Sequence, residues 1–322
     1  MSEQGVVMSD KCLHGTKITK INKQWKKETE AMGKKIIRIL FFIAVVAFLA
    51  GMVTSGRSWA QGTEKSTPAD GGDGWHFLIA PYFWLTAIQG HAEENGNKVD
   101  INVSLGDAID LISEVEFILG GRIEIEKGRW GFIYDGTYLK LGDSGEISTI
   151  RDTKLPIFVP PTVDIQGDVE ITSEMSIMQA ALSYDVYRST KSVGKKPELT
   201  MEAMAGARYT YLHNRMENQA EGFLIANQTT IDQSKNWIDP IVGGRLLWNP
   251  HESWQVNFEA DIGGFGAGSD FSSNLNAGIF YRITDWMLLW GGYRGLYTNY
   301  DKNDFKFDAW IHGPYLGLGF EF

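Results

Sequence analysis

The residues of this sequence that could carry chemistry are carboxylates and arginines, which recur at every second position of several segments. The acidic members are Glu114, Glu116, Glu124, Glu126, Asp135, Glu202, Asp239, Glu259 and Asp261, and the basic members are Arg122, Arg208, Arg245, Arg282 and Arg294. A pair of carboxylates can act as general acid and general base. Charges on one buried face also tend to pair with each other, because an unpaired buried charge is costly. We favour the paired network, in which we expect Arg245 to have an acidic partner such as Asp239 or Glu259.

Nucleophilic catalysis would require a nucleophile, a histidine and a third orienting group in register. The histidines that follow residue 60 are His76, His91, His213, His251 and His312. None of them has a serine or an aspartate at a motif spacing. An outer-rim protease that pairs an aspartate with His213 is a second enzymatic alternative, and we expect no catalytic residues.

Two short stretches could hold a ligand. The glycines of "GGFGAG" at 263–268 lack the strand-to-helix context of a phosphate loop. The oxygen-rich "NYDKND" at 299–304 lacks the twelve-residue spacing of a calcium loop. We interpret the first as an outer turn and the second as a solvated acidic loop, so we expect neither a cofactor nor a metal.

The elements that would position these charges alternate with a period of two. Between Val115 and Ile125 the apolar residues take odd positions, and the charged residues take even ones. The pattern returns at 254–262 and at 275–281. Such alternation is typical of a strand with one apolar and one polar face, either in a soluble sandwich or in a barrel that faces lipid.

Loop lengths favour the barrel. We predict strands at 75–90, 114–127, 129–142, 166–188, 198–213, 236–249, 253–265, 272–284, 286–299 and 307–322. Short and long connections alternate between them, as in outer-membrane barrels. The sequence therefore predicts an all-β fold, a closed antiparallel transmembrane β-barrel of ten strands. If 97–105 and 219–231 also pair, the number becomes twelve.

Two of these strands fit poorly. The first is apolar on both faces and contains Pro81, which cannot donate a hydrogen bond to a neighbouring strand. In the fourth, the apolar residues move from odd positions (Val169 and Ile171) to even ones (Met178 and Leu182). We expect a β-bulge between them.

Aromatic residues gather near the short turns and the ends of the barrel segment. They are Trp75, Trp130, Tyr187, Trp248, Trp254, Tyr281, Trp286 and Phe322. Aromatic side chains concentrate at membrane interfaces, so this set predicts a girdle at one interface.

The N-terminal region resembles an export signal. A basic stretch, an apolar run from Ile39 to Met52 and the small-residue site Ser58-Trp59-Ala60 follow Met32. We predict an N-terminal extension and signal peptide over 1–60 (the signal at about 32–60, removed on export, with a transmembrane anchor as the alternative), a linker over 61–74 and a barrel over 75–322. The only cysteine, Cys12, precedes the barrel, and a net charge of −10 argues against nucleic acid as a partner.

The chain ends in "YLGLGFEF", in which Tyr315, Gly317, Phe320 and Phe322 match a terminal pattern. In this ending it resembles bacterial outer-membrane β-barrel proteins, whose last strand carries a signal read by the barrel-assembly machinery. Phrases such as "APYFWLTAIQG" and "WIDPIVGGRLLW" look like an uncharacterised family of small OmpA-like or porin-like barrels. The resemblance implies the Gram-negative outer membrane, with lipid and lipopolysaccharide as surroundings, and no activity.

These features predict a structural barrel or a narrow pore for ions and small solutes. The arginines and acids would either plug the lumen or set the charge of a slim pore, in which the surplus of acids would favour cations. The alternative is a surface-binding barrel, adhesin-like or in contact with lipopolysaccharide, that uses the segments 91–113, 143–165 and 214–235. An open bore would favour transport, and a filled bore would favour structure or adhesion.

Overall fold

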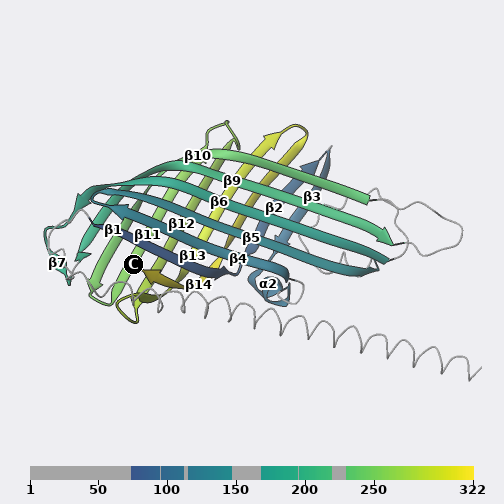
Figure 1. Ribbon diagram of the computed structural model, residues 1–322. Helices are drawn as coiled ribbons and strands as arrows, with labels where there is room; N and C mark the ends of the chain where they lie inside the picture. Colours follow the sequence, from purple (N-terminus) through teal and green to yellow (C-terminus); the bar gives the residue numbers. More distant parts are fainter. Residues whose placement is uncertain (1–73, 95, 112–114, 147–167, 195, 220–229) are drawn as a thin grey trace, which may run out of the picture. The chain divides into compact units, whose positions relative to one another are not determined.

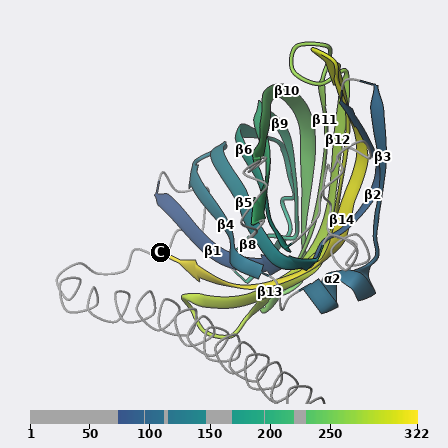
Figure 2. The same ribbon diagram turned by 90° about the vertical axis from the view of Figure 1, so that its right-hand side faces the viewer.

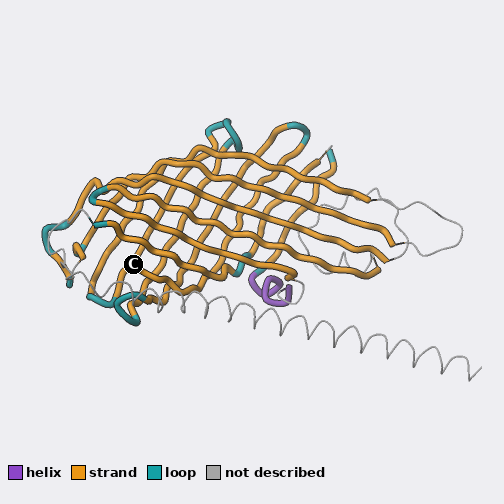
Figure 3. The backbone as a smooth tube through the Cα atoms, in the orientation of Figure 1, coloured by secondary structure: helices purple, strands orange, loops and turns teal. Residues whose placement is uncertain are grey.

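The protein is an antiparallel β-barrel in a computed structural model that describes residues 74–94, 96–111, 115–146, 168–194, 196–219 and 230–322. The elements are β1 (Trp75–Trp84), β2 (Ala87–Glu94), β3 (Asn97–Val103), α2 (Leu105–Leu111), β4 (Val115–Lys127), β5 (Trp130–Glu146), β6 (Asp168–Arg188), β7 (Ser192–Val193), β8 (Lys196–Pro197), β9 (Leu199–Gln219), β10 (Thr230–His251), β11 (Trp254–Gly264), β12 (Phe271–Arg282), β13 (Met287–Lys302) and β14 (Phe305–Glu321). Figures 1 and 3 show their arrangement. The predicted signal and linker, and Glu114, lie outside the described residues.

Ten strands close the barrel, as predicted. The order is β1-β4-β5-β6-β9-β10-β11-β12-β13-β14, and β14 pairs with β1 to complete the ring. The stretch 97–103 does pair, as β3, but only against β2 and outside the ring. The second candidate for an extra strand, 219–231, falls largely in 220–229, which lies outside the described residues.

The first predicted strand is divided into β1 and β2, and both of these pair with β14. Residues Leu78–Trp84 pair with the C-terminal half of β14, whereas Ala87–Glu94 pair with its N-terminal half. Between β1 and β4 the last pair is Tyr82 with Gly120. Beyond this pair the wall forks, and the β2–β3 hairpin runs away from β4 and β5 (Figure 2).

The outward face is apolar over the half of the barrel that carries the short turns. On β6, Leu182 is 58% exposed and Met178 is 37% exposed, and on β10 Ile238 is 59% exposed. Apolar side chains at this exposure along neighbouring strands are expected of a surface that faces lipid. The girdle residue Trp286 is partly exposed, and the rest of the predicted girdle is exposed.

The other half, beyond the row of Met178 and Tyr209, is here called the projecting half, and in it the polarity of β5, β6, β9 and β10 is inverted. Along β6, the buried inward residue changes from the polar Gln179 to the apolar Ile177. The outward residues in this half are the polar Glu174 and Thr172. The outward residue Met178 lies beside Tyr209, and the next outward row contains Tyr211 and Asn236. An apolar inside with a polar outside is the pattern of a strand in water. We conclude that the projecting half extends beyond the lipid-facing belt.

This inversion corrects the β-bulge predicted between Ile171 and Met178. The register of β6 is continuous from Asp168 to Asp185, and the irregularity lies between Asp185 and Tyr187. The apolar residues change position because the two faces exchange environments, without an inserted residue. For the same reason part of the predicted loop 214–235 is strand, since β9 continues to Gln219 and β10 begins at Thr230.

The fork in the wall lies where the polarity inverts. Gly120, Thr137, Ile177, Thr210 and Trp237 form one row across five strands. Gly120 is also the last β4 residue that pairs with β1. A strand edge without partners is not tolerated in hydrocarbon, so the belt must be a closed ring, whereas the projecting half can have free edges.

The short helix α2 follows β3 and begins at a capping box. The Ser104 hydroxyl accepts from the Asp107 amide (3.2 Å), and the Asp107 carboxylate accepts from the Ser104 amide (2.9 Å). Among the described residues, no helix is long and apolar enough to cross a membrane.

Candidate functional site: a luminal ionic layer

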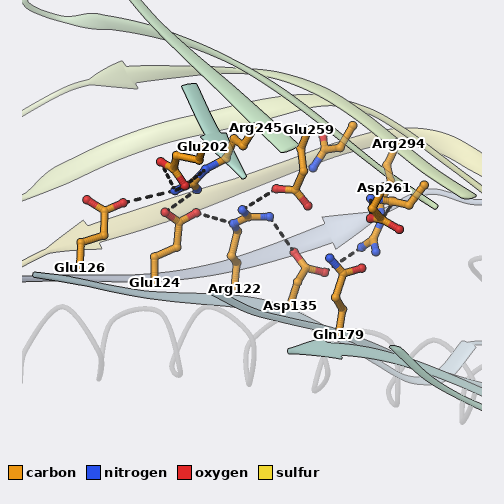
Figure 4. A network of polar contacts seen from close by, with 12 residues as sticks. Arg122, Glu124, Glu126, Asp135, Gln179, Glu202, Arg245, Glu259, Asp261 and Arg294 are labelled. Atoms are coloured by element: carbon orange, nitrogen blue, oxygen red, sulfur yellow. Dashed lines mark hydrogen bonds and ion pairs between the residues drawn. The ribbon is translucent and has the colours of Figure 1, made fainter. Parts of the chain in front are cut away.

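Within the belt, the inward faces of the strands meet in a group of paired charges, shown in Figure 4 and here called the ionic layer. Its members are Arg122, Glu124, Asp135, Glu202, Arg208, Arg245, Glu259, Asp261 and Arg294. The most exposed of them is Glu124, at 7%. They come from β4, β5, β9, β10, β11 and β13, so only the closed barrel brings them together.

Arg122 lies at the centre of the layer. Its Nη2 donates to the Glu259 carboxylate across the lumen at 2.7 Å, and its Nε donates to Glu124 at 2.5 Å. Its Nη1 lies 3.5 Å from the Asp135 carboxylate. One guanidinium therefore links β4, β5 and β11.

Arg245 joins the acids nearest the short turns. It donates to Glu124 at 2.7 Å, to Glu202 at 3.0 Å and to the partly exposed Glu126 at 3.3 Å. We expected Asp239 or Glu259 as its acidic partner. Both expectations are wrong: Glu259 is the cross-strand neighbour of Arg245 but binds Arg122.

The remaining arginines extend the layer toward the projecting half. Arg294 donates to Asp135 at 2.7 Å and to the Asn274 side chain at 2.9 Å. Arg208 donates to Asp261 at 2.5 Å and to Gln179 at 2.7 Å. The Asn274 amide in turn donates to Asp261 at 3.0 Å, which connects the two arginines.

Four of the charges predicted to face the lumen, Glu114 among them, lie apart from the ionic layer or outside the described residues. Arg282 lies at the short-turn rim and binds Glu321 at 2.5 Å. Asp239 is fully buried, and its Oδ1 accepts from the Ser269 amide at 2.6 Å in the turn after β11. The backbone of Glu116 is part of β4, but its side chain is outside the description.

An aromatic stack lines the lumen beside the ionic layer, and sequence reasoning missed it. Trp290 lies parallel to Phe280 with ring centroids 5.3 Å apart, and the rings of Tyr82 and Tyr315 lie 5.2 and 5.0 Å from it. The hydroxyls of Tyr82 and Tyr315 bind Asp135 and Asn276. The sequence offered one signal for this stack. Trp290 alternates in step with Arg294 and therefore shares its face of β13.

The residues of the terminal pattern divide between the two faces of β14. Tyr315 is buried in the lumen and Gly317 shares its face, whereas Phe322 is 55% exposed. Phe320 is buried because its ring stacks on Trp286 at 6.1 Å. The backbone of Phe322 exchanges two hydrogen bonds with that of Phe77, and so ties the end of the chain to β1.

The geometry supports pairing of the charges over catalysis. Every carboxylate of the ionic layer contacts an arginine. His213 lies outside the layer, with its Nδ1 3.7 Å from the Asp232 carboxylate. In the part of the chain that the structure describes, no group of three or more His, Cys, Asp or Glu residues could hold a metal.

Fold and lumen together define a transmembrane β-barrel that resembles bacterial outer-membrane barrel proteins. No family model and no curated protein matches the sequence. Among solved structures, outer membrane protease OmpT from Escherichia coli is similar, with 11% identity over 81% of this chain and 99% of that one (TM-score 0.39).

Two further solved structures are similar. The translocator domain of autotransporter NalP from Neisseria meningitidis matches with 12% identity over 87% of this chain and 97% of that one (TM-score 0.36). The attachment invasion locus protein Ail of Yersinia pestis matches with 12% identity over 78% of this chain and 100% of that one (TM-score 0.30). Similarity at this level supports no inference about activity or ligand.

Proposed function

We propose that this protein is a closed barrel of the bacterial outer membrane, with a structural and surface-binding role and without a diffusion pore. The observation that supports this most is the burial of the ionic layer. Arg122, Arg208 and Arg245 are at most 4% exposed, so solvent hardly reaches the charges that a narrow pore would present to ions. A filled bore favours structure or adhesion over transport.

The pairing of the layer is also the reason it would resist ions. A cation that entered would have to displace an arginine from its carboxylates, and that arginine would remain buried without a partner. Separating one partner from a buried ion pair costs about 3–5 kcal/mol. Passage through the layer would therefore require a rearrangement of the wall.

The projecting half supplies the surface for binding. Its outward residues on β5, β6, β9 and β10 include Lys140, Glu174, His213, Asp232 and Asn236. Because they lie just beyond the lipid-facing belt, we infer that they contact lipopolysaccharide head groups or partners outside the cell.

Conductance tests this proposal. Purified protein that migrates faster unboiled than boiled on a detergent gel, and is therefore folded, is added to a planar bilayer. We expect no current steps where a reference porin gives them in the same chamber. Small cation-selective steps from the folded protein would contradict the proposal and restore the narrow pore.

A further inference from the structure

The projecting half contains a second set of packed side chains in line with the lumen. Trp237 of β10 stacks on Tyr300 of β13 with ring centroids 4.5 Å apart, and it lies 6.1 Å from Phe307 of β14. Phe305 lies 6.0 Å from Tyr300. These four residues, here called the aromatic plug, are each at most 7% exposed.

The plug extends from one wall of the projecting half to the other. β11 ends at Gly264 and β12 begins at Phe271, so beyond these residues the Trp237 ring of β10 meets the rings of β13 and β14 directly. Ile177 and Leu212 from β6 and β9 belong to the same buried cluster, as do Ile101 and Val103 from β3. Above the plug, Lys235 binds Glu94 at 3.0 Å and lies 5.2 Å from the Phe305 ring.

The plug and the ionic layer exclude ions for different physical reasons. The ionic layer holds arginines and acids in place by charge pairing, whereas a packed apolar constriction excludes ions because it cannot be wetted. Leu296 and Thr298 of β13 separate Arg294 of the layer from Tyr300 of the plug. Loss of charge in the layer would therefore leave the plug intact.

We propose that the aromatic plug is a second barrier in series with the ionic layer, so that the barrel conducts only when both are opened. This inference rests on the proposed closed lumen. It assigns to Trp237 and Phe307 a gating role, and it predicts that disrupting either barrier alone leaves the barrel closed.

Conductance of four proteins tests the series arrangement. The wild type is compared with Arg245→Ala/Glu202→Ala, which removes a neutral pair from the layer, with Trp237→Ala/Phe307→Ala, and with the combination. We expect steps from the combination alone. Trp310→Ala is the matched control, because this tryptophan lies on β14 but faces outward and is 42% exposed.

Each other result has a distinct meaning. Steps from the wild type would contradict the proposed function itself. Steps of equal size from one double variant and from the combination would leave the closed wild type in place but overturn the two barriers. A folded combination without steps would also overturn the inference, because neither group would then limit passage.

A labelling experiment covers the case in which the combination fails to fold. Thr298, 2% exposed, lies between the two barriers, and Thr298→Cys is a near-isosteric change that is made together with Cys12→Ser. In whole cells we expect the new thiol to be inert toward a charged methanethiosulfonate reagent. It should react after Trp237→Ala/Phe307→Ala but not after Arg245→Ala/Glu202→Ala. Reaction without opening of the plug would overturn the inference.

Discussion

At the scale of single residues, Arg122 is buried among three acidic partners. Its guanidinium contacts Glu259, Glu124 and Asp135, all buried. Loss of this arginine leaves the buried Glu259 without its ion-pair partner, and it leaves Glu124 with Arg245 and Asp135 with Arg294 as their remaining partners. Leaving a buried charge without its partner costs far more stability than the same ion pair contributes in water.

We therefore expect Arg122→Met to lower the free energy of unfolding by about 3–5 kcal/mol. The control is Arg282→Met, which breaks the pair with Glu321 at the more exposed rim and should cost about 1 kcal/mol or less. Denaturant unfolding in lipid vesicles, followed by tryptophan fluorescence, measures both. Equal losses would mean that the centre of the lumen is hydrated.

The facing of most charges could be predicted from the sequence, but their partners could not. Alternation alone places Arg122, Glu124 and Glu259 on inward faces. Which arginine meets which acid depends on the stagger between strands that are far apart in the sequence, and a period of two contains no information about that stagger. Glu259 is an example, because it binds Arg122 and not the expected Arg245.

At the scale of strands, the inverted polarity of β6 sets the limit of the membrane. Leu182 faces outward in the apolar half, and Thr172 faces outward on the same strand in the projecting half. The sequence contains this change as a shift of the apolar residues. Such a shift indicates a bulge only where a single environment surrounds the whole strand.

An arginine substituted at Leu182 and one substituted at Thr172 should therefore destabilise the barrel by different amounts. Leu182→Arg puts a charge into lipid and should destabilise the barrel by about 2–4 kcal/mol if the site is near the midplane. Thr172→Arg should have little effect, because its side chain stays in water. The yield of folded protein in vesicles of matched thickness reports both. A larger loss of folded protein for Thr172→Arg than for Leu182→Arg would mean that the lipid-facing belt lies in the other half of the barrel.

At the scale of the whole molecule, Phe322 adds to the pairing of β1 with β14 that closes the ring. The backbone of Phe322 binds Phe77 through two hydrogen bonds of 3.0 and 3.2 Å, and its exposed ring belongs to the predicted girdle. Deletion of Phe322 removes these bonds together with the predicted assembly signal. We expect the amount of heat-modifiable protein in the outer membrane to fall sharply.

Two further variants separate these effects. Asn303→Gly, in the turn between β13 and β14, should assemble normally, because Asn303 has a left-handed backbone (φ 54°) that glycine adopts easily. Phe322→Ala keeps the backbone bonds but lacks the ring. If Phe322→Ala assembles as well as the wild type, the ring is not read during assembly, and the terminal match is coincidental.

The fork between β1 and β2 has a consequence for how such a protein can diverge. The circumference of the belt is fixed, because each strand there has a partner on both sides and any added strand must be accommodated by the entire ring. Beyond Tyr82 and Gly120 this constraint ends, and β3 has only β2 as a partner among the described strands. Hairpins can be gained, lost or exchanged at that free edge while the membrane ring is inherited unchanged. Descendants of one barrel can therefore differ in the part that extends beyond the membrane.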